Sequence, residues 1–221
     1  MKKLLTFYSD SHEVLYERYF LPSYERYLAN DFVLIPKKVE QISPTGDFAS
    51  FRFDEVMLQK IDFIATTIAT SGEDFMFSDC DVQFFGSMEY ELGEHDVLFQ
   101  QDFYPGNVCA GFFVAKQNVG THQFFTRARD TLAARIGMRT DDQMIINEML
   151  REPVPLVRAG MLPKEKYWTV GNWTQGAVWN GEDFECPSSI ISHHANFTTN
   201  VANKIKLLDM VREKMRAYGK A

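Results

Sequence analysis

The chain has 221 residues, a net charge of −7 at neutral pH and a sequence pI near 5.3. This length fits one large α/β domain or two small ones, and 45% of apolar residues can build a sizeable core. No basic stripe offers a phosphate footprint, which argues against a nucleic-acid partner and against an anionic membrane surface. An acidic protein can still bind a pyrophosphate if a divalent metal neutralises that ligand.

The N-terminus and the cysteines both indicate a cytoplasmic protein. The apolar stretch from Leu4 to Tyr8 is too short for a signal peptide, and no run approaches the length of a transmembrane helix. The cysteines are odd in number and widely spaced, so we expect neither a disulfide framework nor a zinc site from Cys80, Cys109 and Cys186.

The first half of the chain alternates between strands and helices. Residues 3–8 are expected to form a strand, and Ser11 can cap a helix that Pro22 interrupts or ends. A second apolar strand at 31–35 and an amphipathic helix follow, and then a short buried strand at 75–77. The apolar residues of the amphipathic helix recur at helical spacing, at Phe53, Val56, Met57, Ile61, Ile64 and Ile68.

The second half continues this alternation less regularly. Residues 97–99 and 108–115 are strand candidates, and the apolar positions within 124–136 suit a helix. A short strand is expected at 189–191, before a C-terminal helix at 201–215.

The order of elements indicates an α/β fold with a mostly parallel sheet and helices on both faces. The stretch 164–187 shows no clean period, so we expect a structured loop region there. In sheets of this kind, ligands bind at the carboxyl ends of the strands.

Two carboxylates directly follow the strand at 75–77. Asp79 and Asp81 are separated by one residue, so their side chains can converge once the chain turns. Two oxygen donors at one point suit Mg²⁺ or Mn²⁺, with phosphate oxygens completing the coordination shell. The alternative is an ordinary turn at a strand end, where Asp is common.

A pair of histidines and a pair of lysines lie near the C-terminus. One imidazole of His193 and His194 can join two carboxylates on Mn²⁺, or both can be ordinary polar groups at a strand end. Lys204 and Lys206 follow at the start of the C-terminal helix, where an ammonium group and the helix N-terminus favour phosphate. An ordinary solvated lysine is the alternative there.

Three further positions are candidates for ligand contacts. Lys60 lies close to the apolar face of its helix, so its ammonium group must snorkel or meet an anion. Asp142 lies in the first turn of another helix, which Thr140 and Gln143 can open as a capping box. Asp142 can serve there only to interact with the helix dipole, or it can hold a sugar hydroxyl or act as a base. Gly111 can allow close backbone approach to a ligand or serve packing.

Taken in this order, these segments resemble the nucleotide-diphospho-sugar transferases with the GT-A fold. The resemblance covers most of the chain. It is carried by Thr6-Phe7-Tyr8-Ser9, Phe77-Ser78-Asp79-Cys80-Asp81, Cys109-Ala110-Gly111-Phe112, Asp142-Gln143 and His193-His194-Ala195-Asn196, followed by Lys204.

The resemblance implies a GT-A-type, Rossmann-like fold and a metal-dependent glycosyltransferase that moves a sugar from a nucleotide-diphosphate sugar to an acceptor hydroxyl. Mn²⁺ or Mg²⁺ would bind the donor pyrophosphate, held by Asp79, Asp81 and a late histidine placed at His194. The residues implied in binding the donor and its sugar are Thr6, Phe7, Tyr8, Asp10, Lys60, Asp79, Gly111 and Lys204.

The sequence departs from the family pattern after the late histidine. The usual Trp-Gly arrangement is replaced by the residues 196–200, and no glycine follows before the helix. This departure leaves open the choice between His193 and His194, and between Lys204 and Lys206.

The stereochemistry of transfer and the nucleotide also stay open. An inverting enzyme needs a general base near the acceptor hydroxyl, for which Asp142 and Asp102 are the candidates, whereas a retaining enzyme needs none in that place. The resemblance favours UDP over GDP. It also implies a single domain over 1–221, with a nucleotide-binding half at about 1–100 and a sugar and acceptor half at about 101–221.

Two other functions are compatible with the same residues. A haloacid dehalogenase-type phosphatase would use Asp79 as nucleophile and Asp142 to hold Mg²⁺, although its motif usually lies near the N-terminus. A non-catalytic module that binds nucleotide sugars is the second alternative, against which the joint presence of Asp79, Asp81 and His194 argues.

Overall fold

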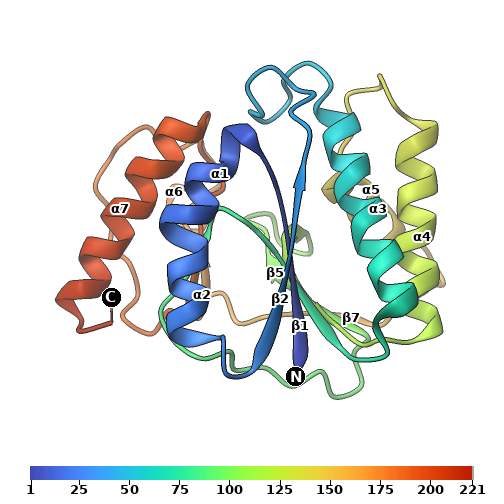
Figure 1. Ribbon diagram of the computed structural model, residues 1–221, viewed down its shortest axis with the longest axis horizontal. Helices are drawn as coiled ribbons and strands as arrows, with labels where there is room; N and C mark the ends of the chain where they lie inside the picture. The colour runs from blue at the N-terminus through green and yellow to red at the C-terminus, as the bar shows by residue number, and fades with distance from the viewer. Residues whose placement is uncertain (221) are drawn as a thin grey trace.

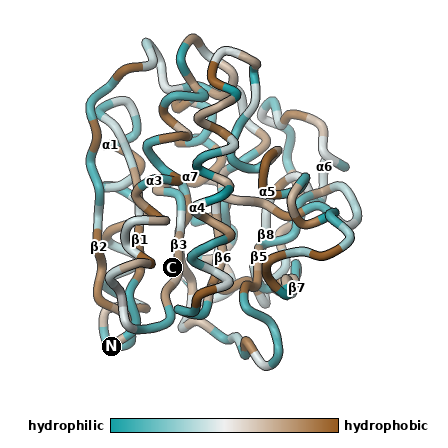
Figure 2. The backbone as a smooth tube through the Cα atoms, turned by 90° about the vertical axis from the view of Figure 1, so that its right-hand side faces the viewer, coloured by the Kyte–Doolittle hydropathy of each residue, from teal (hydrophilic) through white to brown (hydrophobic). Residues whose placement is uncertain are grey.

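A six-stranded sheet forms the centre of the computed structural model, which describes residues 1–220. Figure 2 shows its strands side by side across the view. Within this sheet, β6 (Val108–Ala115) is antiparallel to both of its neighbours and the other pairs are parallel, so the sheet is mostly parallel as predicted. In sheet order the strands are β2 (Phe32–Val39), β1 (Lys2–Ser9), β3 (Phe75–Asp79), β6 (Val108–Ala115), β5 (Val97–Gln101) and β7 (Ala159–Met161).

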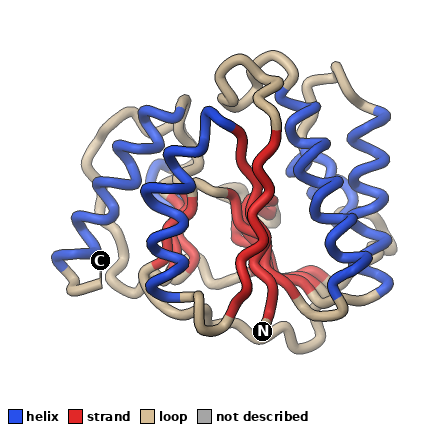
Figure 3. Tube along the Cα trace, viewed as in Figure 1, coloured by secondary structure: helices blue, strands red, loops and turns tan. Residues whose placement is uncertain are grey.

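Helices cover both faces of this sheet (Figures 1 and 3). On one side lie α3 (Phe53–Ser71), α4 (Val119–Ala134) and α5 (Asp142–Leu150). On the other side lie α1 (Glu13–Leu15), α2 (Leu21–Tyr27) and, beyond them, α7 (Val201–Ala217). Within the described residues, each helix is too short or too polar to cross a lipid bilayer.

Successive side chains of the central strands pack alternately into two hydrophobic cores, one on each face of the sheet. In β1, Leu4 packs into the core beneath α2 and α7, whereas its neighbour Leu5 packs into the core beneath α3 and α4. In β6, Phe112 and Phe113 divide in the same way. Successive side chains of a strand point to opposite faces, so strands covered on both faces are apolar throughout.

A second, three-stranded sheet lies on the α7 side of the molecule. Its strands are β4 (Val82–Phe84), β9 (Ser192–His194) and β8 (Tyr167–Thr169), in that order, with β9 antiparallel to β4 and parallel to β8. The register pairs Val82 with His194, and the carbonyl oxygen of Asp81 accepts a hydrogen bond from the Ala195 N–H at 3.0 Å. The small sheet therefore joins the chain after β3 to the C-terminal region.

One of two expectations about the first helical segment needs correction. Ser11 does not cap it, because the residue before the first turn is Ser9 and the Ser11 hydroxyl instead contacts Nδ1 of His12 at 2.9 Å. Pro22 interrupts the helix without ending it. The chain passes through a π-helical turn at Tyr16–Phe20 and continues as α2, with Pro22 as the second residue of α2.

Four features of the second half also differ from expectation. Asp141, not Thr140, caps α5, since its Oδ1 accepts a hydrogen bond from the Met144 N–H at 2.7 Å. Ile136 lies beyond the end of α4. The last strand is β9, just after the expected 189–191, and the expected loop region contains β8 and the short helix α6 (Gly171–Thr174).

Candidate active site

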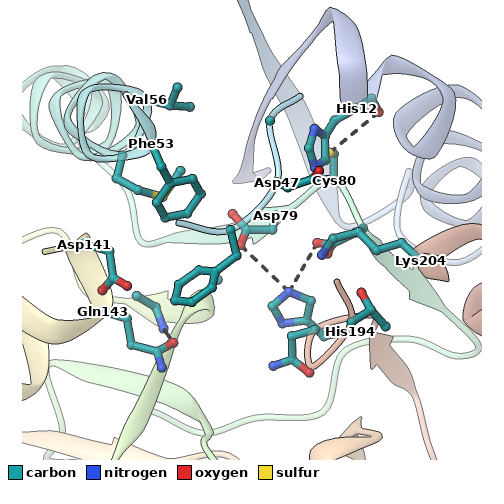
Figure 4. Close-up of a pocket in the computed structure, with 18 of the residues that line it drawn as sticks. His12, Asp47, Phe53, Val56, Asp79, Cys80, Asp141, Gln143, His194 and Lys204 are labelled. Atoms are coloured by element: carbon teal, nitrogen blue, oxygen red, sulfur yellow. Dashed lines mark hydrogen bonds and ion pairs between the residues drawn. The ribbon is translucent and has the colours of Figure 1, made fainter. Parts of the chain in front are cut away.

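A cavity of about 370 Å³ opens at the carboxyl ends of β1 and β3, in the place that the fold predicts for a ligand (Figure 4). The first turns of α5 and α7 border it through Asp142 and Lys204, and α3 contributes Lys60 from the far side. Helix N-termini directed at a cavity favour negatively charged ligands.

Three potential metal ligands converge in this cavity. One ligand atom each from Asp79, Asp81 and His194 lies within 4.8 Å of the others. Nε2 of His194 is 3.2 Å from Oδ1 of Asp81 and 3.8 Å from Oδ2 of Asp79. A dashed line in Figure 4 marks the contact between His194 and Asp79. Two carboxylates and one imidazole on one face of a cavity are a donor set that suits Mn²⁺.

Lys204 completes one side of this group. Its ammonium group forms an ion pair with Oδ2 of Asp81 and donates a hydrogen bond to the carbonyl oxygen of Ala195 at 3.1 Å. Burial acts to raise the pKa of Asp81, but Lys204 and His194 outweigh burial and hold that pKa well below its usual range. Asp81 is therefore ionised throughout the physiological range.

Lys60 meets two anions rather than snorkelling to solvent. Its side chain is only 5% exposed, and its Nζ lies 2.7 Å from Asp142 and 3.3 Å from Asp79. Burial acts to lower the pKa of Lys60, yet the two carboxylates raise it above the usual value. Three carboxylates, two ammonium groups and the imidazole of His194 therefore lie together at the cavity wall.

The two histidines of β9 point to opposite sides, as neighbours on a strand do. His194 faces the carboxylates, whereas the His193 ring packs against Trp168 with 5.5 Å between centroids. Burial lowers the pKa of His193 to about 3. Burial acts in the same direction on His194, but the charge of Asp81 outweighs it and raises the pKa of His194 to about 10.

Gly111 provides the room in which the acidic group and the imidazole meet. A Cβ atom at this position would lie 2.3 Å from Oδ2 of Asp79 and 2.5 Å from Cε1 of His194, both far inside van der Waals contact. From the sequence, Gly111 could serve either packing or the close approach of the backbone to a ligand. In the structure, the missing side chain makes space for two residues of the cavity wall.

Asp102 and Gln143 border the cavity beyond β6. Oδ2 of Asp102 accepts a hydrogen bond from the Gln143 amide at 3.4 Å, and Oδ1 accepts one from the Phe103 N–H at 2.8 Å. Burial raises the pKa of Asp102. Asp102 is thus a carboxylate of increased basicity, and Asp142 forms an ion pair with Lys60.

Comparison with known proteins identifies the family. The model of a family described as nucleotide-diphospho-sugar transferase matches residues 27–208, which is most of the chain. The chain belongs to this family. It is a glycosyltransferase, as the resemblance of its motifs implied, and the phosphatase and the non-catalytic module are set aside. No curated protein sequence matches the chain.

Solved structures share the GT-A-type fold of this transferase at low identity. A glycosyltransferase involved in the glycosylation of the major capsid of the virus PBCV-1 is similar with a TM-score of 0.64 at 12% identity, covering 94% of this chain and 98% of that one. The glycosyltransferase GlyE of Streptococcus pneumoniae has a TM-score of 0.59 at 10% identity, covering 99% and 64%. The galactosyltransferase LgtC, solved with donor and acceptor sugar analogues, has a TM-score of 0.56 at 9% identity, covering 87% and 86%.

Not every residue that the resemblance implied for the donor reaches the cavity of this transferase. Phe7 and Tyr8 line it at the end of β1. Thr6 is fully buried inside the sheet, and Asp10 is exposed and forms an ion pair with Lys38 at 2.9 Å. Neither Thr6 nor Asp10 contributes to the cavity wall, so both are left out of the donor site proposed below.

The sequence reasoning missed one residue that lines the cavity and one buried residue behind it. His12 lines the cavity near the end of β1, and burial lowers its pKa; nothing in its sequence surroundings marks it. Gln100 is fully buried at the end of β5, and its Oε1 lies 2.9 Å from Nδ1 of His194. A polar residue that directly follows the apolar Val97-Leu98-Phe99 is a signal that could have drawn attention to Gln100.

Proposed function

We propose that this transferase moves a sugar from a uridine diphosphate sugar to an acceptor hydroxyl, and that Mn²⁺ or Mg²⁺ bound by Asp79, Asp81 and His194 is required. The convergence of these three ligand atoms within 4.8 Å carries the proposal. They lie where parallel strands end, in a cavity that two ammonium groups also reach. The family indicates the class of reaction. The two carboxylates and the imidazole indicate which metal ions can bind.

The charges around the cavity support a diphosphate leaving group. When bound, the cation would act as a Lewis acid on the departing diphosphate, whose charge grows during transfer. Lys204 lies in the first turn of α7 and would contact the phosphates together with the helix N-terminus. Lys60 holds Asp79 and Asp142 in place and would lie close to the donor sugar.

The nucleoside would lie against the end of β1. Phe7, Tyr8 and His12 line this part of the cavity, and the Tyr8 ring is held by stacking on Tyr16 with 4.3 Å between centroids. UDP is the favoured nucleotide and GDP is the alternative to test. We also propose that residues 1–221 work as one domain, because both halves of the chain line the same cavity.

Asp102 is the better candidate for a general base in an inverting reaction. Its raised pKa favours accepting a proton, whereas Asp142 forms an ion pair with Lys60 and suits the binding of a sugar hydroxyl. Asp102→Asn should then lower kcat about 100-fold or more with little change in donor affinity. A retaining enzyme needs no such base, so the anomeric configuration of the product decides whether Asp102 has this role.

Calorimetry with UDP and with GDP, each with and without Mn²⁺, tests the proposal. We expect UDP to bind in the presence of Mn²⁺ and to bind much more weakly without it. Asp81→Ala should abolish metal-dependent binding and leave the circular dichroism spectrum unchanged. The matched control is Asp183→Ala, which removes an exposed carboxylate that pairs with Lys214 and does not line the cavity, so this variant should bind UDP normally. Normal metal-dependent binding by Asp81→Ala would show that the site assignment is wrong.

A further inference from the structure

Gln100 has a fixed orientation behind His194, which lines the cavity. Its side chain is fully buried, at a register irregularity between Phe99 and Gln100 where β5 pairs with β6. The amide Nε2 donates hydrogen bonds to the carbonyl oxygens of Tyr167 at 3.2 Å and Trp168 at 3.4 Å. Carbonyl oxygens only accept, so they hold the NH₂ end and leave the amide oxygen facing the other way.

The amide oxygen faces His194 and determines which ring nitrogen carries a hydrogen. Oε1 of Gln100 is an acceptor and lies 2.9 Å from Nδ1 of His194, so Nδ1 must be the N–H that donates. The opposite ring nitrogen, Nε2, points at Asp81 and Asp79. A cation at this point would take the place of any hydrogen on Nε2, while the hydrogen on Nδ1 stays with Gln100.

We propose that Gln100 is a positioning residue that holds His194 in the Nδ1–H form, with Nε2 directed at the metal ion. The proposal rests on the proposed function, since it requires that His194 binds a cation. A hydrogen bond to the far nitrogen of a ligating imidazole fixes the tautomer and orientation of the ring, and its loss typically weakens metal binding by about 10-fold to 100-fold.

The neighbouring histidine provides an internal contrast. Nε2 of Gln83 donates to the carbonyl oxygen of Leu208 at 3.0 Å and lies 3.3 Å from Nδ1 of His193. Because a donor faces Nδ1 there, His193 carries its hydrogen on Nε2. Two adjacent histidines of one strand, each held by a buried glutamine, therefore have opposite tautomers, and only the form of His194 leaves Nε2 available to a cation.

The test compares Mn²⁺ affinity, measured by titration in saturating UDP, between Gln100→Met and the matched control Gln83→Met. Methionine keeps the length of the side chain and removes both of its hydrogen-bonding ends. We expect Gln100→Met to weaken Mn²⁺ binding by about 10-fold or more and Gln83→Met to stay within about threefold of the wild type. If both variants weaken binding equally, or neither does, the positioning role is refuted.

A double variant separates positioning from a general structural effect. If Gln100 acts through His194, adding Gln100→Met to His194→Ala should cause no further loss of Mn²⁺ affinity. An additive loss would overturn the proposal. These outcomes differ from failure of the proposed function, in which the wild type itself would not bind UDP with Mn²⁺.

The tautomer can also be observed without any variant, which decides the matter even if Gln100→Met does not fold. In the ¹⁵N-histidine NMR spectrum of the wild type with Mg²⁺ and UDP, we expect His194 as the Nδ1–H form and His193 as the Nε2–H form. An Nε2–H form for His194 would overturn the proposal.

Discussion

Replacing Gly111 with alanine should damage the proposed metal site without unfolding the protein. The new Cβ atom would lie 2.3 Å from Oδ2 of Asp79 and 2.5 Å from Cε1 of His194, whereas ordinary contacts begin near 3.4 Å. One or both side chains must therefore move by about 1 Å. A displacement of about 1 Å at a reacting centre can cost about 100-fold in rate, which corresponds to about 2.7 kcal/mol of transition-state stabilisation.

The assay for Gly111→Ala is the metal-dependent release of UDP from a UDP-sugar. We expect the rate to fall about 100-fold while the circular dichroism spectrum stays unchanged, because the strain falls on two side chains at the cavity and not on the backbone. Gly86→Ala is the matched control, since its Cβ would meet only Ile191, at 3.3 Å. Turnover by Gly111→Ala within about threefold of the wild type would refute the assignment of Asp79 and His194 to the reacting centre.

Three further variants or conditions test the charged groups of the cavity. Lys60→Met leaves Asp142 buried without its partner, so chemical denaturation should show a loss of about 3–5 kcal/mol; a loss below about 1 kcal/mol would contradict the pairing. His194 has a pKa raised to about 10, so Mn²⁺ must displace a proton below that pH. Mn²⁺ affinity should therefore rise about tenfold per pH unit above neutrality, with proton release that calorimetry in different buffers detects; a flat profile would contradict this. Lys204→Met should weaken UDP binding in Mn²⁺ by about tenfold, whereas Lys206→Met, at an exposed position of the same helix, should not, and equal effects would remove the special role of Lys204.

Local patterns were enough to predict the framework of the fold. The apolar run of β6 gave its bounds correctly, and the helical spacing from Phe53 to Ile68 located α3. The same spacing drew attention to Lys60, because a lysine near an apolar face needs a partner. The partner itself, Asp142, could not be predicted, since it approaches from another helix through tertiary packing.

The parts that failed depend on contacts distant in sequence. Ser11 has the right chemistry for a cap, but the helix begins before it and its hydroxyl contacts His12. β8 is only three residues long and gains its stability from pairing with β9, so no periodicity reveals it. Gln100 was missed for the same reason, because its importance comes from contacts with β8 and β9, which the sequence does not place beside it.

The choice between His193 and His194 shows how one register decides the chemistry of the cavity. Pairing Val82 with His194 places that imidazole beside Asp81, the residue that precedes β4. Because side chains alternate along a strand, a slip of one residue would exchange the two histidines. The small sheet therefore does more than extend the fold. It brings the C-terminal region to the carboxylates after β3, so a bound cation would also tie the small sheet to the central one, and removal of the cation should loosen β9 first.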